Sequence, residues 1–175
     1  MKRLTVALLA AAISTPILAA EKPYVGIDYQ LGTYTHKKTD VNPETLRLRA
    51  GTEINKSLAV EAQAAFGTGG DTYVATGNVK YDIKVDSFYS IFLKPQLQIS
   101  KSITAYGLLG GTYIDVSSSS SNKLLFPDDS GFKHMFSYGA GADFAIKNGI
   151  RIGADYVQYI DEYSAISVGI RIPIQ

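Results

Sequence analysis

Charged side chains recur at every second position in several segments of this sequence, with apolar residues between them. Arg47 and Arg49, for example, flank Leu48. Buried charges are tolerated when they pair and hydrogen-bond with one another. Acids and bases nearly balance in this pattern, so we expect one enclosed network of ion pairs formed by Asp28, Arg47, Arg49, Glu53, Glu61, Lys94, Asp115, Asp143, Arg151, Asp155 and Arg171.

The two histidines, His36 and His134, are the candidates for acid–base catalysis. His134 and Ser137 are three residues apart, and in a strand this spacing points them to opposite faces. His36 lies beside Lys37 and Lys38 with no serine nearby. We therefore predict no catalytic residue and no enzymatic activity.

Metal and phosphate sites are not indicated either. The segment 128–131 (Asp-Asp-Ser-Gly) offers oxygen ligands but lacks the spacing and the closing Glu of a calcium loop. The segment 67–70 (Gly-Thr-Gly-Gly) precedes no helix, so it is no phosphate cradle. Because Cys is absent, no thiolate metal site or disulfide can form. We expect no metal and no cofactor.

Alternation of apolar and polar residues, which is typical of strands with one apolar face, runs through the chain. In the last segment five β-branched residues, from Ile166 to Ile174, oppose Ser167, Gly169 and Arg171. The same pattern predicts eight strands, over residues 25–32, 46–54, 58–66, 83–93, 106–114, 136–146, 150–156 and 166–174.

The connections between these segments differ in length. Short turns are expected at 55–57, 100–102, 147–149 and 161–163, and Asn148-Gly149 is a strong hairpin signal. Longer loops are expected at 35–43, 67–82 and 117–132. Short turns at one rim and long loops at the other are typical of an outer-membrane barrel, whose loops lie outside the cell.

The direction of the apolar face separates a membrane barrel from a soluble one, in which it points inward. Here the opposite face carries glycines and both signs of charge, which suits a crowded lumen. Aromatic residues near strand ends are expected to form interfacial girdles; they are Tyr24, Tyr34, Phe66, Tyr81, Tyr106 and Phe144. The sequence thus predicts an all-β fold, an eight-stranded antiparallel up-and-down transmembrane β-barrel.

Two strands need a separate assignment of faces. The pattern places Val85 with Tyr89 and Ile91 on the lipid face of the fourth strand, and Tyr106, Leu108 and Ile114 on that of the fifth. Phe88 and Phe92 fall on the lumen face by counting. Pro95 lies in the same stretch and leaves open a bulge that would shift this register.

The N-terminal residues have the build of a secretory signal peptide. Lys2 and Arg3 precede a short apolar stretch, and Ala19-Ala20 offers a cleavage site after either residue. We expect a signal peptide at 1–20 and a barrel domain at 21–175. Loss of Lys2 and Arg3 lowers the formal charge from +1, so no charge excess points to nucleic acid.

Three segments, 105–113, 136–144 and 151–156, resemble the small porin-family or surface-antigen barrels of the OmpA and OmpX type. The resemblance spans the whole region expected to mature. It implies a monomer in the outer membrane of a Gram-negative bacterium, reached through the periplasm. It also implies contacts with periplasmic chaperones, the barrel-assembly machinery, outer-membrane lipid and lipopolysaccharide. Such proteins usually end on an aromatic residue, whereas this chain ends Ile174-Gln175.

The expected function follows from the narrow interior. Eight strands leave room for little more than side chains. We therefore expect a plugged, ion-paired lumen and a role in envelope structure or surface adhesion, with a narrow channel for ions or small solutes as the alternative. Loop lysines either bind lipopolysaccharide phosphates as point charges or are simply solvated; they are Lys37, Lys38, Lys80, Lys123 and Lys133.

Overall fold

The computed structural model describes residues 22–36, 39–69, 71–75, 79–120 and 129–174. Ten strands occupy most of these residues, and no helix among them is long and apolar enough to cross a membrane. The strands are β1 (Lys22–His36), β2 (Thr39–Val41), β3 (Glu44–Asn55), β4 (Leu58–Gly69), β5 (Asp71–Ala75), β6 (Val79–Gln98), β7 (Ile103–Ser120), β8 (Asp129–Ala145), β9 (Arg151–Ile160) and β10 (Tyr163–Pro173). The expected signal peptide, residues 1–20, lies outside the described residues.

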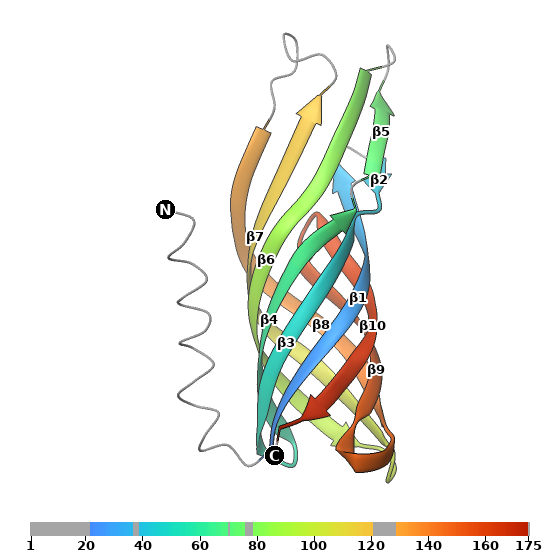
Figure 1. Cartoon of the computed structure of the whole chain (residues 1–175). Coiled ribbons are helices and arrows are strands. Elements are labelled where there is room, and N and C mark those ends of the chain that lie inside the picture. The colour runs from blue at the N-terminus through green and yellow to red at the C-terminus, as the bar shows by residue number, and fades with distance from the viewer. Residues whose placement is uncertain (1–21, 37–38, 70, 76–78, 121–128, 175) are drawn as a thin grey trace.

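The strands form one antiparallel sheet that closes on itself (Figure 1). Eight strands follow one another around the wall in the order β1, β3, β4, β6, β7, β8, β9 and β10. Closure comes from β1, which pairs with β3 on one side and with β10 on the other, from Tyr24 opposite Pro173 to Tyr34 opposite Tyr163. The prediction of an all-β, eight-stranded antiparallel barrel is confirmed.

Tight turns join the strands at the end of the barrel where both described termini lie (Figure 1). At 55–57 the Ser57 N–H donates to Asn55 Oδ1 over 2.8 Å. A short 3-10 helix, Lys147–Gly149, joins β8 to β9. There Asn148 and Gly149 have φ of 60° and 75°, the left-handed conformation that Asn and Gly adopt most readily. The turn predicted at 161–163 lies at the opposite end, where the Glu162 carbonyl oxygen accepts from Thr35 N at 2.8 Å, and it is shorter because Tyr163 begins β10.

At the opposite end the strands continue beyond the barrel (Figure 1). Pairing of β6 with β7 reaches Tyr81 and Ser120, and pairing of β7 with β8 reaches Ser118 and Asp129. The short strands β2 and β5 pair there with β1 and β6. The expectation of long loops at 35–43, 67–82 and 117–132 was therefore wrong for much of their length: hairpin ladders continue through residues that the sequence pattern leaves unassigned.

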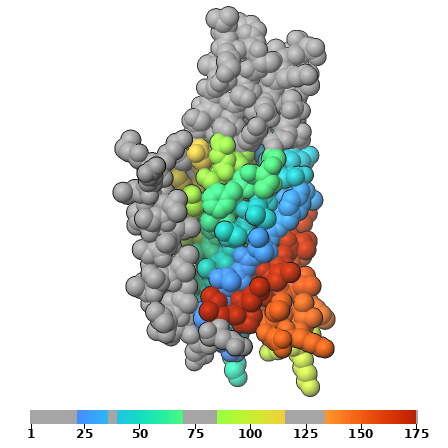
Figure 2. Space-filling view, viewed as in Figure 1, coloured from blue at the N-terminus to red at the C-terminus, as the bar shows by residue number. Residues whose placement is uncertain are grey.

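The outer wall is apolar. Its side chains include Ile91, which is 67% exposed, and Phe136, which is 68% exposed. Figure 2 shows the neighbouring strands β4, β3, β1 and β10 side by side as a continuous surface. The polar positions of the same strands point into the lumen, where Arg47 and Glu61 are fully buried. The predicted direction of the apolar face is correct for these strands.

The face predicted for the fifth strand was wrong. Tyr106, Leu108 and Ile114 are buried in the lumen, whereas Leu109 and Tyr113 face outward. This strand, β7, has leucines on both faces at 108 and 109, so alternation cannot orient it.

Val85 was also misplaced. A register shift between Val85 and Ser87 on β6 turns Val85 inward, while Phe88 and Phe92 lie in the lumen as counting predicted. Pro95 stays in register opposite Leu58.

The prediction that aromatic residues near strand ends form interfacial girdles was only partly correct. Tyr24, Tyr34 and Tyr106 are buried inside, whereas Phe66 and Phe144 are exposed on the wall. The side chain of Tyr81 lies outside the described part. Nearness to a strand end thus does not place an aromatic ring on the lipid face, because strand parity decides its direction.

Replacing Ile91 by Arg is expected to lower the free energy of unfolding in lipid vesicles by about 2–4 kcal/mol, because the site is far from both strand ends and faces outward. Ile99→Arg, beside the turn at 100–102, is the matched control and should cost only about 0–1 kcal/mol. Denaturant titration of vesicle-inserted protein measures both. Wild-type stability of the Ile91 variant would show that this side chain does not face lipid.

Candidate functional site

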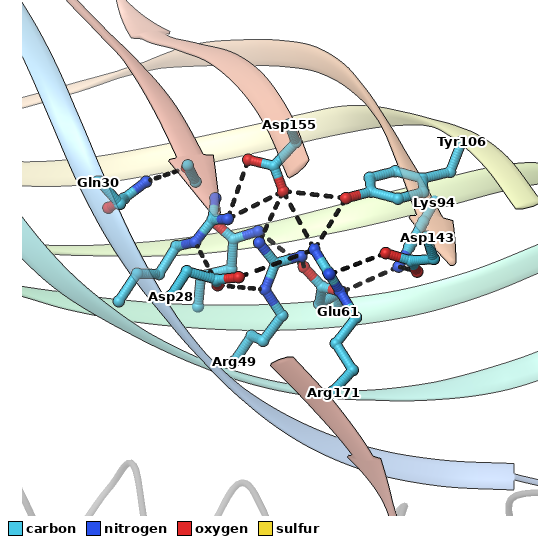
Figure 3. Close-up of polar contacts among 12 residues, drawn as sticks. Asp28, Gln30, Arg49, Glu61, Lys94, Tyr106, Asp143, Asp155 and Arg171 are labelled. Atoms are coloured by element: carbon cyan, nitrogen blue, oxygen red, sulfur yellow. Dashed lines mark hydrogen bonds and ion pairs between the residues drawn. The ribbon is translucent and has the colours of Figure 1, made fainter. Parts of the chain in front are cut away.

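A network of charged side chains fills the lumen (Figure 3). It lies nearer the tight turns, because Lys94 and Asp143 are close to the turn ends of β6 and β8. Every strand of the wall supplies at least one member. Four bases and four acids are included, so their charges balance. The members are Asp28 from β1, Arg47 and Arg49 from β3, Glu61 from β4, Lys94 from β6, Tyr106 from β7, Asp143 from β8, Asp155 from β9 and Arg171 from β10.

Asp155 is the acceptor shared by the three arginines. Arg47 Nη2 lies 2.9 Å from both of its carboxylate oxygens, and Arg49 Nη2 lies 2.7 Å from Oδ2. Arg171 Nη2 contacts the same Oδ2 at 3.3 Å. Tyr106 donates its hydroxyl to this oxygen at 3.0 Å and accepts a hydrogen bond from Arg171. Asp155 therefore links β3, β7, β9 and β10.

Asp28 joins the two arginines of β3 from the other side. Its Oδ2 lies 3.0 Å from Arg47 Nε and 2.7 Å from Arg49 Nε. Each arginine thus bridges Asp28 and Asp155 with different nitrogens of one guanidinium. The rigid fork of donors in arginine suits this bridging, which a lysine ammonium could not reproduce.

Lys94 and Glu61 extend the network toward β8. Lys94 Nζ lies 3.4 Å from Glu61 Oε2 and 3.5 Å from Asp143 Oδ2. It also sits 4.0 Å from the centre of the Tyr106 ring, a cation–π distance. Glu61 also accepts hydrogen bonds from Tyr24 and Gln63, so both of its oxygens are partnered.

Glycines on the lumen face make room for this network. A Cβ on Gly153 would overlap Arg171 Nη1 and Asp143 Oδ1, which pair at 2.8 Å directly above it. A Cβ on Gly169 would meet Asp28 Oδ1 in the same way. The glycines that suggested a crowded lumen in the sequence are thus the positions over which charged side chains lie.

The structure does not bring all the predicted charges together. Glu53 and Arg151 form a separate pair at 2.9 Å, nearer the turns, and Lys22 lies 3.6 Å from Glu53. Asp115 was misassigned to the lumen: Ile114 before it is fully buried, so alternation turns Asp115 to the outer face of β7, opposite Ser87. That error follows from the inverted face of the fifth strand.

An aromatic cluster fills the lumen on the other side of the network, and sequence reasoning missed it. The ring centres of Phe88 and Tyr159 are 4.3 Å apart, and those of Tyr159 and Tyr163 are 5.8 Å apart. The Tyr159 hydroxyl accepts from Arg47 at 2.8 Å, so this ring connects the two layers. The lumen positions of Phe88 and Phe92 were the available signal; residues 157–163 lay beyond the predicted seventh strand.

The geometry favours a structural role for the buried polar residues of the lumen. Ser137 is buried and donates to the Tyr159 carbonyl oxygen at 2.6 Å, whereas His134 is exposed on the opposite face of β8. Among the described residues no group of His, Cys, Asp or Glu is arranged to hold a metal ion. Lys37, Lys38 and Lys123 lie outside the described residues, as does the side chain of Lys133.

Comparison with known proteins gives the same architecture. The family described as "Outer membrane protein beta-barrel domain" matches residues 5–170. No curated protein sequence matches the chain.

Among solved structures, the attachment invasion locus protein Ail of Yersinia pestis is 22% identical with a TM-score of 0.58, over 86% of this chain and 98% of Ail. Neisserial surface protein A is 14% identical with a TM-score of 0.60, over 86% and 96%. The N-terminal barrel of Pseudomonas aeruginosa OprF is 10% identical with a TM-score of 0.50, over 86% and 97%. At these identities the likenesses show the fold.

Replacing Arg49 by Met is expected to destabilise the barrel by about 3–5 kcal/mol, because Asp28, Glu61 and Asp155 would each lose a buried partner. The matched control is Arg151→Met, whose side chain is 28% exposed in its pair with Glu53. That change should cost no more than about 1 kcal/mol. Urea unfolding in vesicles measures both, and equal losses would mean that the central network is no more important than the outer pair.

Proposed function

Because the chain belongs to the outer membrane protein β-barrel family, we propose that it is a monomeric surface protein of the Gram-negative outer membrane. In this proposal the barrel is a plugged scaffold without enzymatic activity. The hairpins beyond its rim make the functional contacts, in envelope structure or in adhesion to another surface. The chain reaches the membrane through the periplasm by way of its signal peptide, chaperones and the barrel-assembly machinery.

The observation that carries this proposal is the filled lumen. Polar side chains from all eight wall strands, charged on every strand except β7, meet across it, and Phe88, Phe92, Tyr159 and Tyr163 pack beside them. Passage of a solute would require breaking ion pairs such as Arg47 with Asp155, at 2.9 Å. This argues against the alternative of a narrow channel.

The projecting strands support the second half of the proposal. Short turns face the periplasm in such barrels, so the extended β6, β7 and β8 ladders face the outside of the cell. An exposed ladder presents side chains at regular spacing to a partner. Ail was solved in complex with sucrose octasulfate, a heparin analogue, which makes heparin a sensible first probe. The lysines at 37, 38, 123 and 133 are proposed to contact lipopolysaccharide phosphates.

Planar-bilayer recording tests the plugged lumen. We expect no steady single-channel openings from the wild-type protein, because the network spans the barrel. Arg49→Ala combined with Asp155→Ala should raise the ionic current, since the double change preserves charge balance while removing the centre of the network. Reproducible openings of the wild-type protein would favour the channel instead.

Shortening the β7–β8 hairpin tests the surface role. Replacing residues 119–128 by Asn-Gly would close the ladder just beyond the pair of Ser118 and Asp129 with a favoured two-residue turn. We expect binding of expressing cells to heparin, matrix protein or cultured cells to fall at least several-fold, with barrel mobility on unheated gels unchanged.

The matched control replaces Ser57 by Gly at the other end of the barrel, which keeps Lys56 in place. This exchange also leaves a two-residue hairpin and should leave cell binding unchanged. Equal binding by the wild type, the shortened hairpin and this control would contradict an adhesive role for β7 and β8.

A further inference from the structure

The three tight turns share one arrangement that the lumen and the projecting hairpins do not explain. Each carries a single exposed lysine between two apolar residues of the outer wall. Lys56 lies between Ile54 and Leu58, Lys101 between Ile99 and Ile103, and Lys147 between Ile146 and Ile150. These apolar neighbours include Ile99, which is 64% exposed, and Ile54, which is 52% exposed.

The turns hold these lysines at a fixed height just beyond the apolar wall. In the first turn the Asn55 side chain accepts from Ser57 N, and in the second the Ser100 hydroxyl accepts from Ile103 N at 3.1 Å. In the third, Lys147 begins the 3-10 helix that continues through the left-handed residues 148 and 149. The backbone therefore cannot carry the lysines far from the membrane surface, and only their flexible stems can extend.

Positive charges predominate at this rim. Apart from the central network, the described charged residues at the turn end include the cations Lys22, Lys56, Lys101, Lys147 and Arg151 and one acid, Glu53. Glu53 is already paired with Arg151 and Lys22. The three turn lysines are therefore not neutralised by that acid.

We propose that Lys56, Lys101 and Lys147 form a ring that binds the phosphates of anionic glycerophospholipids in the periplasmic leaflet. Ammonium groups directly beyond an apolar band lie at the depth of lipid headgroups. A cation near an anionic bilayer surface gains appreciable attraction. The carboxylates of the cell wall lie beyond the headgroups, and two- or three-residue turns do not project toward them. The ring thus recognises a lipid surface and helps to fix the depth and tilt of the barrel.

Spin-labelled lipids test this proposal on protein purified from membranes and reconstituted in phosphatidylcholine bilayers. Electron paramagnetic resonance gives the association constant of labelled phosphatidylglycerol relative to labelled phosphatidylcholine. For the wild type we expect a preference of about fivefold at low salt. Because screening shortens the range of these attractions, 1 M NaCl should reduce the preference toward one. A preference that persists in high salt would overturn the proposal without any variant.

The variant Lys56→Gln/Lys101→Gln/Lys147→Gln should bring the low-salt preference close to one, and the matched triple Lys→Arg variant should retain it. Gel mobility before and after heating checks that both variants fold. An undiminished preference in the Gln variant would overturn the proposal. Pull-down on purified peptidoglycan sacculi tests the cell wall as the other source of negative charge. If the Gln variant lost wall binding but kept its lipid preference, the ring would be assigned to the cell wall and the proposal would be overturned.

Discussion

Closure of the hydrogen-bonded ladder is the constraint on which the rest of this structure depends. The hydrocarbon interior of a bilayer offers no water to an unpaired backbone group, so a sheet can span it only without edges. Here β1 meets both β3 and β10, and its register is unbroken from Lys22 to Leu31 with β3 and from Tyr24 to Tyr34 with β10. A closed wall has one outside and one inside, and the period of two then assigns every side chain to lipid or to the lumen.

Because the charged residues face a narrow lumen, they must form ion pairs and hydrogen bonds with one another. Side chains from eight strands share a space that holds little besides them, so each acid must find a base within reach. The network in turn specifies the alignment of the strands. A slip of one residue on β3 would turn Arg47 and Arg49 toward lipid and leave Asp28 and Asp155 without those partners. Glycines such as Gly153 are needed for the same network, because a larger residue would displace the ion pair of Arg171 and Asp143 that lies above it.

The polarity of the lumen face explains which strands could be oriented from the sequence and which could not. Strands with a polar lumen face, such as β3 and β10, were oriented correctly, because their alternation separates Arg49 from Leu48 and Arg171 from Ile172. On β7 and on the part of β6 nearer the projecting hairpins, the lumen-facing side chains are also apolar. Alternation along the sequence therefore does not show which face of these strands points inward. Leu108 and Asp115 were misplaced for this reason, whereas Val85 was misplaced because the register shift between Val85 and Ser87 inverts its direction. Pairwise contacts such as Arg171 with Asp143 depend on barrel register, which no short motif encodes.

The apolar upper lumen also accounts for how the projecting strands are held. Tyr163 and Val41 are buried in the same cluster as Phe88 and Val85, although Val41 belongs to the short β2 outside the wall. The register shift between Val85 and Ser87 on β6 turns the Val85 side chain inward instead of toward lipid. The short strand β2 is therefore held by side-chain packing inside the barrel mouth.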